Sequence, residues 1–406
     1  MRPDARTALE LFGAGVDAVA GETSVRRALR ELEAGPGGLG PRVRLVAFGK
    51  AADAMARGAL GALGERLVGG LVATKHGHLT EPVRTHPRLR SLEASHPVPD
   101  ESSLRAGEAL LAEVRAAGPD EHLLALVSGG GSALVEALVD GVDLDELRRR
   151  TDALLAGGAP IGEINRERRA LSRIKGGGLL REARAGRITQ LLISDVPGDR
   201  IEDIASGPFV VPAPGGASAG GSGAGLPVAV DTRLVATNAI ARRATLEAAR
   251  ARGLVAVDAG ALLDGDVAEA PAKLRAALAA HADADVLVAG GEPTVVLPDS
   301  PGRGGRNQQL AALLAGSLAA GRVAGDGAAA RETWLACGTD GTDGPTDAAG
   351  GVVDADTVAR AGACDLGEAL ARADTGPWLE AAGALVRTGP TGTNVMDLAI
   401  AVRARG

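Results

Sequence analysis

Short runs of apolar residues, each ending in a glycine-rich turn and followed by a helical pattern, recur along this chain of 406 residues. The runs are rich in Val, Leu and Ile, and they lack the alternation of a half-exposed strand. They therefore predict strands that are buried on both faces. Helical patterns at residues 101–117 and 238–252 fall between them. Strands that alternate with helices indicate an α/β fold with mostly parallel sheets flanked by helices.

One segment interrupts this alternation. Residues 212–227, PAPGGASAGGSGAGLP, are of low complexity and predict a flexible linker or loop. We therefore expect two domains, a Rossmann-like domain at 1–228 and a second α/β domain at 229–406, whose final segment, 388–406, packs back on the cleft. Ligands of open α/β sheets bind beyond the carboxyl ends of the strands. The sequence thus predicts an active site in the cleft between the domains.

Composition excludes several classes of protein. The chain has three Phe, two Trp and no Tyr, and its net charge is −7, which argues against a nucleic-acid partner. Cys337 and Cys364 are too few for a disulfide framework or a cysteine-rich zinc site, and they fit a reducing compartment. The sequence shows no signal-peptide pattern and no apolar run of the roughly 18 residues that a membrane span needs. We expect a cytoplasmic protein with no membrane partner.

Lysine is scarce, which draws attention to the few that are present. Only four of the 44 basic residues are lysines, and Lys50, Lys75 and Lys175 lie at glycine-rich junctions, whereas Lys273 lies in an ordinary helical stretch. Lysine supplies a compact point charge that arginine does not. Lys50 follows a strand and opens a helix, where a cation is disfavoured. It is a candidate for neutralising a transferring phosphoryl group or holding a carboxylate, the alternative being a solvated lysine.

Two glycine-rich segments are candidate anion sites. Backbone N–H groups of a glycine loop before a helix can cradle a phosphate or carboxylate, although a tight strand-to-helix turn is the alternative. The spacing is neither that of a P-loop nor G-x-G-x-x-G. Lys175, in RIKGGG, could clamp an anion or shape a turn between two helices. The candidate loop consists of Ser128, Gly129, Gly130, Gly131 and Ser132.

Carboxylates also follow strands. Asp195, in LLISDVPGD, is placed to bind Mg²⁺ or to accept a hydroxyl proton, or else it forms an Asx-turn. The loop GTDGTDGPTD holds Asp340, Asp343 and Asp347 in a spacing that differs from an EF-hand. This loop is either a looser Mg²⁺ or nucleotide site or a series of Asp-Gly turns. Lys75 and its neighbouring histidines favour an ordinary polar loop over a metal site, because no third ligand is suggested.

The last third of the chain adds a candidate cation. Glu292 ends a strand, and Arg306 begins a helix beside glycines, where it could grip a phosphate or carboxylate through two hydrogen bonds. The alternative for Arg306 is a flexible exposed loop. Asn307 follows it, and Asn394 lies in a polar loop, TGPTGTN, with donors suited to a ligand.

Taken in order, these motifs resemble the D-glycerate 2-kinase family, whose C-terminal part is called the MOFRL domain. The matching strings run from about residue 43 to the end and make the match specific. They are FGKAA, TKHGH, SHPVPDE, LVSGGGSAL, INRERRALSRIKGGGL, ISDVPGD, IASGP, GGEPTV, GRGGRNQ, GTDGTDGPTDAAGG and TGPTGTNVMDLAIA.

The resemblance implies a two-domain α/β enzyme that transfers the γ-phosphoryl group of ATP to the 2-hydroxyl of D-glycerate, with Mg²⁺. It implies that Lys50 and Arg306 are an active-site pair. The family is sometimes labelled hydroxypyruvate reductase, but the chain lacks a dinucleotide fingerprint. An NAD(P)H-dependent reductase and a non-catalytic nucleotide- or metabolite-binding protein are the alternatives. The family is expected to have a helical stretch after ASGP, where this chain has only the short segment 212–227. A homodimer is expected, and this difference affects the surface at which an oligomer contact could form.

Overall fold

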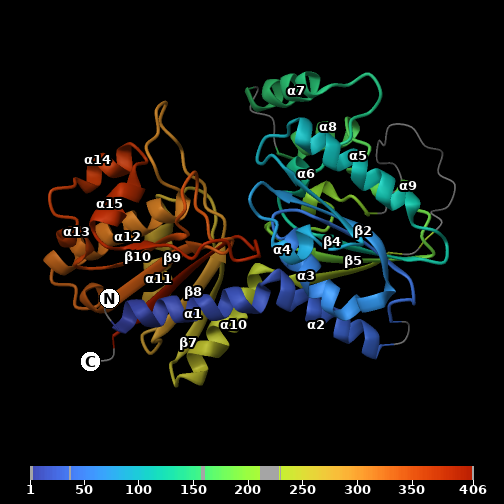
Figure 1. Cartoon of the computed structure of the whole chain (residues 1–406). Coiled ribbons are helices and arrows are strands. Elements are labelled where there is room, and N and C mark those ends of the chain that lie inside the picture. Colours follow the sequence, from blue (N-terminus) through green and yellow to red (C-terminus); the bar gives the residue numbers. More distant parts are fainter. Residues whose placement is uncertain (1–2, 36–37, 157–160, 211–227, 229, 405–406) are drawn as a thin grey trace. The chain divides into compact units, whose positions relative to one another are not determined.

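The chain divides into two units, each with its own sheet, in this computed structural model (Figure 1). The structure describes residues 3–35, 38–156, 161–210, 228 and 230–404. We call Ala20–Ala236 the N-terminal unit, and Met1–Val19 with Thr237–Gly406 the C-terminal unit. The low-complexity segment at 212–227, where we expected a linker, lies outside the described residues.

The N-terminal unit contains a parallel sheet of six strands among its described residues, in the order β3-β2-β1-β4-β5-β6. Both faces are covered, and every residue of β4 is buried, as the unbroken apolar runs predicted. The strands are β1 (Val43–Phe48), β2 (Leu67–Lys75), β3 (Leu89–Ala94), β4 (His122–Val127), β5 (Arg187–Ile193) and β6 (Val230–Ala236).

Helices and short helical turns connect these strands. The predicted helix at 101–117 is α5 (Glu101–Ala116), and Asp100 caps it by accepting hydrogen bonds from the N–H groups of Ser102 and Ser103. The others are α2 (Gly21–Ala34), α3 (Ala52–Leu63), α4 (Glu81–Arg84), α6 (Gly131–Leu134), α7 (Leu144–Ala156), α8 (Ile161–Ala170) and α9 (Gly178–Glu182), with 3₁₀ turns at Gly64–Arg66 and Ile204–Ser206.

The helix predicted after the glycine loop is much shorter than expected. The string ALVEALV, which follows the glycine loop, favours a helix, but α6 ends at Leu134, and Val135 is extended. Further on, Leu138 forms an isolated antiparallel bridge with Ser172. The apolar residues of this string enter the core without helical periodicity, and Val135 and Ala137 are each 1% exposed. Tertiary burial therefore overrides the local helical pattern here.

The sheet of the C-terminal unit differs from the mostly parallel sheet that we expected. Its described strands have the order β11-β10-β9-β12-β8-β7, and only β7 and β8 run parallel. Strands β9 and β10 are joined by a loop with no crossover helix, which permits antiparallel pairing. Continuous apolar runs do not distinguish the two pairings. The strands are β7 (Ala256–Leu263), β8 (Val286–Gly291), β9 (Glu332–Gly338), β10 (Gly350–Asp354), β11 (Leu385–Val386) and β12 (Asp397–Arg403).

The first helix, α1 (Pro3–Val19), packs in the C-terminal unit and not with the residues that follow it. It contacts α10 (Asn238–Ala251) and β12. A Cβ added at Gly15 would lie 2.4 Å from Thr245 Oγ1, so only glycine permits this approach. The unit also includes α11 (Ala270–Ala279), α12 (Arg306–Val323), α13 (Thr357–Arg360), α14 (Leu366–Ala371), α15 (Thr375–Ala381) and a 3₁₀ turn at Ala329–Arg331.

This grouping differs from the predicted division after residue 228 at two places. Helix α1 belongs with the C-terminal unit, and β6 pairs with β5 in the N-terminal sheet. Neither long-range pairing leaves a local signal in the sequence.

The packing of α1 gives a testable expectation. Phe12 is 3% exposed, so Phe12→Ala should lower the free energy of unfolding by about 3 kcal/mol or more. Hydrogen exchange should accelerate in α10 and β12 but not in β4 or β5. Glu10→Ala, on the exposed side of the same helix, is the control and should change little. Faster exchange confined to β4 and β5 would contradict the grouping of α1 with the C-terminal unit.

Candidate functional site

The loops after β1 and β4 meet where the strand order of the N-terminal sheet reverses. The chain proceeds outward from β1 to β3 on one side and from β4 to β6 on the other, so these two strands flank the switch point. The Lys50 N–H donates to the carbonyl oxygen of Gly129 over 2.9 Å. The Ala51 N–H donates to Ser128 Oγ over 3.0 Å. These bonds hold the two predicted loops together as one surface.

Four consecutive N–H groups of the glycine loop have no acceptor in the described part of the protein. Among the described residues, the N–H groups of Gly129, Gly130, Gly131 and Ser132 donate no hydrogen bond to a protein acceptor. Gly130 has a φ of 77°, which turns the backbone before α6. Successive N–H groups in such a turn form a concave anion-binding nest. Ser132 Oγ lies 2.7 Å from Ser206 Oγ, which fixes the hydroxyl at the end of the loop.

Two predicted charged side chains lie directly against this loop. A Cβ added at Gly130 would lie 3.0 Å from Lys50 Cγ. A Cβ added at Gly129 would lie 1.6 Å from Asp195 Oδ2, so any side chain at 129 would displace that carboxylate. The turn after Asp195 is closed by Ser194, whose Oγ accepts from the Val196 N–H over 3.3 Å. The glycine loop, Lys50 and Asp195 thus form one group of residues, which we call the glycine-loop cluster.

Lys175 is engaged inside the protein. Its side chain is 2% exposed and forms an ion pair with Glu136, which is 1% exposed. The other oxygen of Glu136 accepts from Ser172 Oγ over 2.5 Å and from the Ala137 N–H over 3.1 Å. We predicted Lys175 as an anion contact. In the structure, the charge of its ammonium group is instead neutralised by the Glu136 carboxylate. Of the two readings of RIKGGG, the turn-shaping one agrees with its position between α8 and α9.

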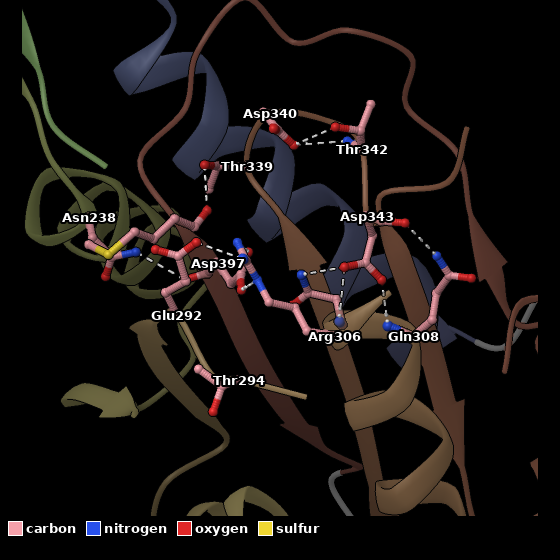
Figure 2. A network of polar contacts seen from close by, with 12 residues as sticks. Asn238, Glu292, Thr294, Arg306, Gln308, Thr339, Asp340, Thr342, Asp343 and Asp397 are labelled. Carbon is pink, nitrogen blue, oxygen red and sulfur yellow. Dashed lines mark hydrogen bonds and ion pairs between the residues drawn. The ribbon is translucent and has the colours of Figure 1, made fainter. Parts of the chain in front are cut away.

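In the C-terminal unit, Arg306 is held by two carboxylates (Figure 2). Its Nε donates to Asp397 Oδ2 over 2.6 Å and its Nη2 to Asp397 Oδ1 over 3.1 Å. Its Nη1 donates to Glu292 Oε1 over 2.6 Å. This two-bond grip fixes the guanidinium plane. The side chain is 34% exposed, so part of it faces outward from a fixed position, unlike a side chain on a flexible loop.

Burial opposes charge on both partners of this ion pair. Burial raises the pKa of Asp397 to about 6, although Arg306 acts to lower it. Burial also acts to lower the pKa of Arg306, but the Asp397 and Glu292 carboxylates outweigh it and raise that pKa. Arg306 is therefore always cationic, and its partner loses its charge in mildly acidic solution.

Asp343 holds the start of α12. Its Oδ1 accepts from the Asn307 N–H over 3.0 Å, and its Oδ2 accepts from the Gln308 N–H over 2.8 Å (Figure 2). Burial raises the pKa of Asp343 despite these bonds. Both oxygens are thus used to satisfy helix donors, which argues against our prediction of Asp343 as a metal ligand. The amide of Asn307 also donates to Asp343, over 3.2 Å, so this predicted binding residue has a structural contact.

The rest of the acidic loop forms turns. Asp340 Oδ1 accepts from the Thr342 N–H over 2.9 Å, which is an Asx-turn (Figure 2). A Cβ added at Gly338 would lie 3.4 Å from this Asp340 oxygen and 3.5 Å from Asp397 Oδ1, so the loop lies beside the Arg306 ion pair. Within the described residues, no group of three or more His, Cys, Asp or Glu is arranged to hold a metal ion. Asn394, also predicted, is 7% exposed in the neighbouring loop.

Sequence reasoning missed three residues of these clusters: Glu136, Asn238 and Asp397. Asp397 begins β12, and its carboxylate meets Arg306 because β12 runs antiparallel to β8. Asn238 begins α10, and its amide donates to the carbonyl oxygens of Val395 and Asp397 over 2.9 and 3.0 Å. An acid directly before an apolar run was the one local signal for Asp397, in NVMDLAIAV.

The fold and these clusters define the class of the protein. Polar and charged groups gather at strand ends of two α/β sheets, which is the architecture of α/β enzymes that act on small molecules. No helix in the described ranges is both long and apolar enough to span a membrane.

Sequence comparisons identify the family within that class. Residues 7–220 match the family described as Domain of unknown function (DUF4147), and residues 285–397 match the MOFRL family. The chain is 34% identical to the D-glycerate 2-kinase of Thermotoga maritima, covering 97% of each chain. It is 35% identical to the glycerate 2-kinase of Pyrococcus horikoshii, covering 89% of this chain and 87% of that one. The protein therefore belongs to the D-glycerate 2-kinase family, as the motifs predicted.

Structural comparison agrees, and one further relative carries another name. The crystal structure of glycerate kinase from Thermotoga maritima superposes with a TM-score of 0.84 at 33% identity, covering 98% of this chain and 99% of that one. A relative from Agrobacterium vitis, 37% identical over 88% of this chain and 98% of its own, is named putative hydroxypyruvate reductase.

The capping role of Asp343 can be tested by stability. Asp343→Ala should lower the free energy of unfolding by about 2 kcal/mol or more, because it leaves the buried donors at the start of α12 unpaired. The measurement is urea unfolding at pH 8. Asp347→Ala is the matched control, since Asp347 is 71% exposed in the same loop, and it should change stability by less than about 0.5 kcal/mol. Equal effects of the two substitutions would contradict the capping role.

Proposed function

We propose that this protein is an ATP-dependent glycerate 2-kinase, which transfers the γ-phosphoryl group of ATP to the 2-hydroxyl of D-glycerate and yields 2-phospho-D-glycerate and ADP. The observation that carries the proposal is the glycine-loop cluster, in which four N–H groups without a protein acceptor lie beside Lys50 and Asp195. Such a surface suits a phosphate chain. The relatives named glycerate kinase supply the acceptor and the position of transfer.

Phosphoryl transfer needs positioning and charge stabilisation more than covalent help from the protein. The 2-hydroxyl oxygen forms a bond to the γ-phosphorus as the bond from that phosphorus to the β,γ-bridging oxygen breaks. The electron pair leaves with ADP, and the hydroxyl proton passes to Asp195. Lys50 neutralises charge on the transferring group, and the N–H groups of residues 129–132 hold the phosphates.

Arg306 supplies the second cation of the proposed reaction. Its guanidinium is fixed by Asp397 and Glu292, and its exposed part is available to the glycerate carboxylate or to a phosphate. Glu292 then acts by holding Arg306. Asn307, Asp340 and Asn394 remain predicted binding residues, because their segments lie near Arg306. Lys175 is less favoured, because it is paired with Glu136.

The residues suit Mg²⁺ only in part. Mg²⁺ is commonly held by one or two carboxylates together with substrate phosphates, so a full protein cage is not required. Asp195, beside the glycine loop, would be such a carboxylate in place of its role as the proton acceptor, with Asp340 as a second candidate. Asp343 is less suited, because it is buried and both of its oxygens already accept hydrogen bonds from helix donors. Bound Mg²⁺ would neutralise charge on the phosphates.

A reductase is the rival activity, because two relatives are named putative hydroxypyruvate reductase. The turn after β1 reads AFGKAADA and lacks the G-x-G-x-x-G spacing that brings a dinucleotide pyrophosphate to the first helix of such folds. Oxidation of NADH by hydroxypyruvate without ATP, followed at 340 nm, would favour the reductase.

The cellular compartment and the oligomeric state of the protein are also proposals. Cys337 and Cys364 are both free, Cys364 at the surface, which suits a reducing compartment such as the cytoplasm. A homodimer stays a prediction.

The two cations give the first test of the activity. Lys50→Ala and Arg306→Ala should each lower kcat for glycerate-dependent ADP formation by more than tenfold without a change in fold. Lys273→Ala and Arg322→Ala are matched controls, since both side chains form surface ion pairs, and they should retain kcat. Near-normal turnover in both Lys50→Ala and Arg306→Ala would contradict the assignment.

The titration of Asp397 gives a second test. Above a pH of about 6 its carboxylate is charged and holds Arg306, and below it the folded protein protonates Asp397 and the ion pair is lost. Wild-type kcat/KM should therefore fall with an acidic limb near pH 6. Asp397→Asn should lack that limb and should be about tenfold less active at pH 8. An unchanged limb in Asp397→Asn would contradict this role.

Stability should depend on this group in the opposite direction. The folded pKa of Asp397 lies above the unfolded value of about 3.9, so its stabilising contribution is complete below pH 4 and is lost as the pH rises through 6. The Tm of the wild type relative to Asp397→Asn should fall over that interval.

A further inference from the structure

A cavity of about 310 Å³ opens beside the glycine loop within the N-terminal unit. Gly130 and Ser132 of the glycine loop line it, together with Ala133. The segment His96–Pro99, residues of α7 and Arg168 of α8 also line it. The volume is at the lower end of the range of about 300–1,000 Å³ typical of small-molecule pockets.

The walls of this cavity are largely apolar. Pro97, Pro99, Leu144 and Leu147 are among the residues that line it. Val98, which also lines the cavity, is 57% exposed. A flat ring inserted between these walls would cover apolar surface that water now contacts. The chain has no tyrosine, so prolines and aliphatic side chains take the part that aromatic rings play elsewhere.

Charge is distributed unevenly around the cavity. Lys175 and Glu136 line it, but they neutralise each other in their buried ion pair. Arg148 is tethered to the wall, because its Nη2 donates to the Pro99 carbonyl oxygen over 3.1 Å. In the described part of the chain, Arg168 has no ion-pair partner. The cavity therefore combines apolar lining residues with an unpaired cation and with glycine-loop residues whose N–H groups have no protein acceptor among the described residues.

We propose that this cavity binds the nucleoside part of the nucleotide, with the phosphate chain running onto the N–H groups of the glycine loop. The inference rests on the proposed kinase function and assigns the nucleotide, not the acceptor, to the N-terminal unit. The purine packs against Pro97, Pro99 and the side chains of α7 that line the cavity, and Arg168 binds a phosphate. Thr151 and Asp152, which also line the cavity, supply polar groups for the ribose hydroxyls.

The three-carbon acceptor fits this cavity poorly. D-glycerate carries a polar group on every carbon, so it would leave the apolar walls uncovered and would place its carboxylate near Asp152. A nucleoside combines a large apolar face with a few hydroxyls, which matches the walls. Only a nucleotide also extends far enough to place phosphates on the adjoining loop.

Three substitutions in the full-length protein test the assignment. Ala133→Leu introduces a larger side chain into the cavity, Val98→Asp places a charge among its apolar lining residues, and Arg168→Gln removes the unpaired cation. Val255→Asp and Arg149→Gln are matched controls, since Val255 is 51% exposed and Arg149 is a surface residue of α7. Steady-state kinetics give KM for ATP and for D-glycerate separately, and calorimetry gives the Kd of ADP.

The cavity variants should raise KM for ATP and the Kd of ADP by about tenfold, or about 1.4 kcal/mol, with KM for D-glycerate within twofold of wild type. The controls should match wild type. A rise in KM for D-glycerate alone, or no change in either constant, would overturn the assignment. If wild type binds ADP but does not phosphorylate D-glycerate, the proposed function fails, while loss of ADP binding in the variants still supports the nucleotide cavity.

Discussion

The hydrogen bond from the Lys50 N–H to the Gly129 carbonyl oxygen is the constraint on which the glycine-loop cluster depends. It joins the loops after β1 and β4, beside the N–H groups of residues 129–132, which have no acceptor within the described chain. Gly49 makes the approach possible. Its φ is 121°, and a Cβ there would lie 2.5 Å from the Ser128 carbonyl oxygen. Backbone geometry, before any side chain, therefore creates the surface that we propose as an anion site.

In the C-terminal unit, side chains hold the candidate cation. A guanidinium could move freely on its long stem, and Asp397 prevents this for Arg306 by binding it at two atoms. The cost is a carboxylate that is fully buried and therefore hard to ionise. Asp343 adds a second buried carboxylate, which fixes the helix on which Arg306 stands. Rigidity of the cation is thus obtained from groups that titrate above the usual range of aspartate.

Local signals explain which features the sequence predicted. The buried strands, the glycine loop, Lys50 and Asp195 all follow from residues within one strand-turn-helix segment, and the parallel order of β1, β4 and β5 brings them to one sheet edge. Lys175 was different, because its partner Glu136 is 39 residues away and lay in a string that predicted a helix. Asp397 is 91 residues from Arg306, and its position depends on antiparallel strands that apolar runs do not distinguish from parallel ones. The packing of α1 with α10 is likewise a long-range contact.

The most direct test of the account is the chemical identity of the product. The wild-type protein would be incubated with ATP, Mg²⁺ and D-glycerate, and the phosphorylated product would be resolved by ³¹P and ¹³C nuclear magnetic resonance. If the protein is a glycerate 2-kinase, we expect 2-phospho-D-glycerate, formed in an amount equal to that of ADP. Formation of 3-phosphoglycerate, or release of ADP with no phosphorylated glycerate, would contradict it.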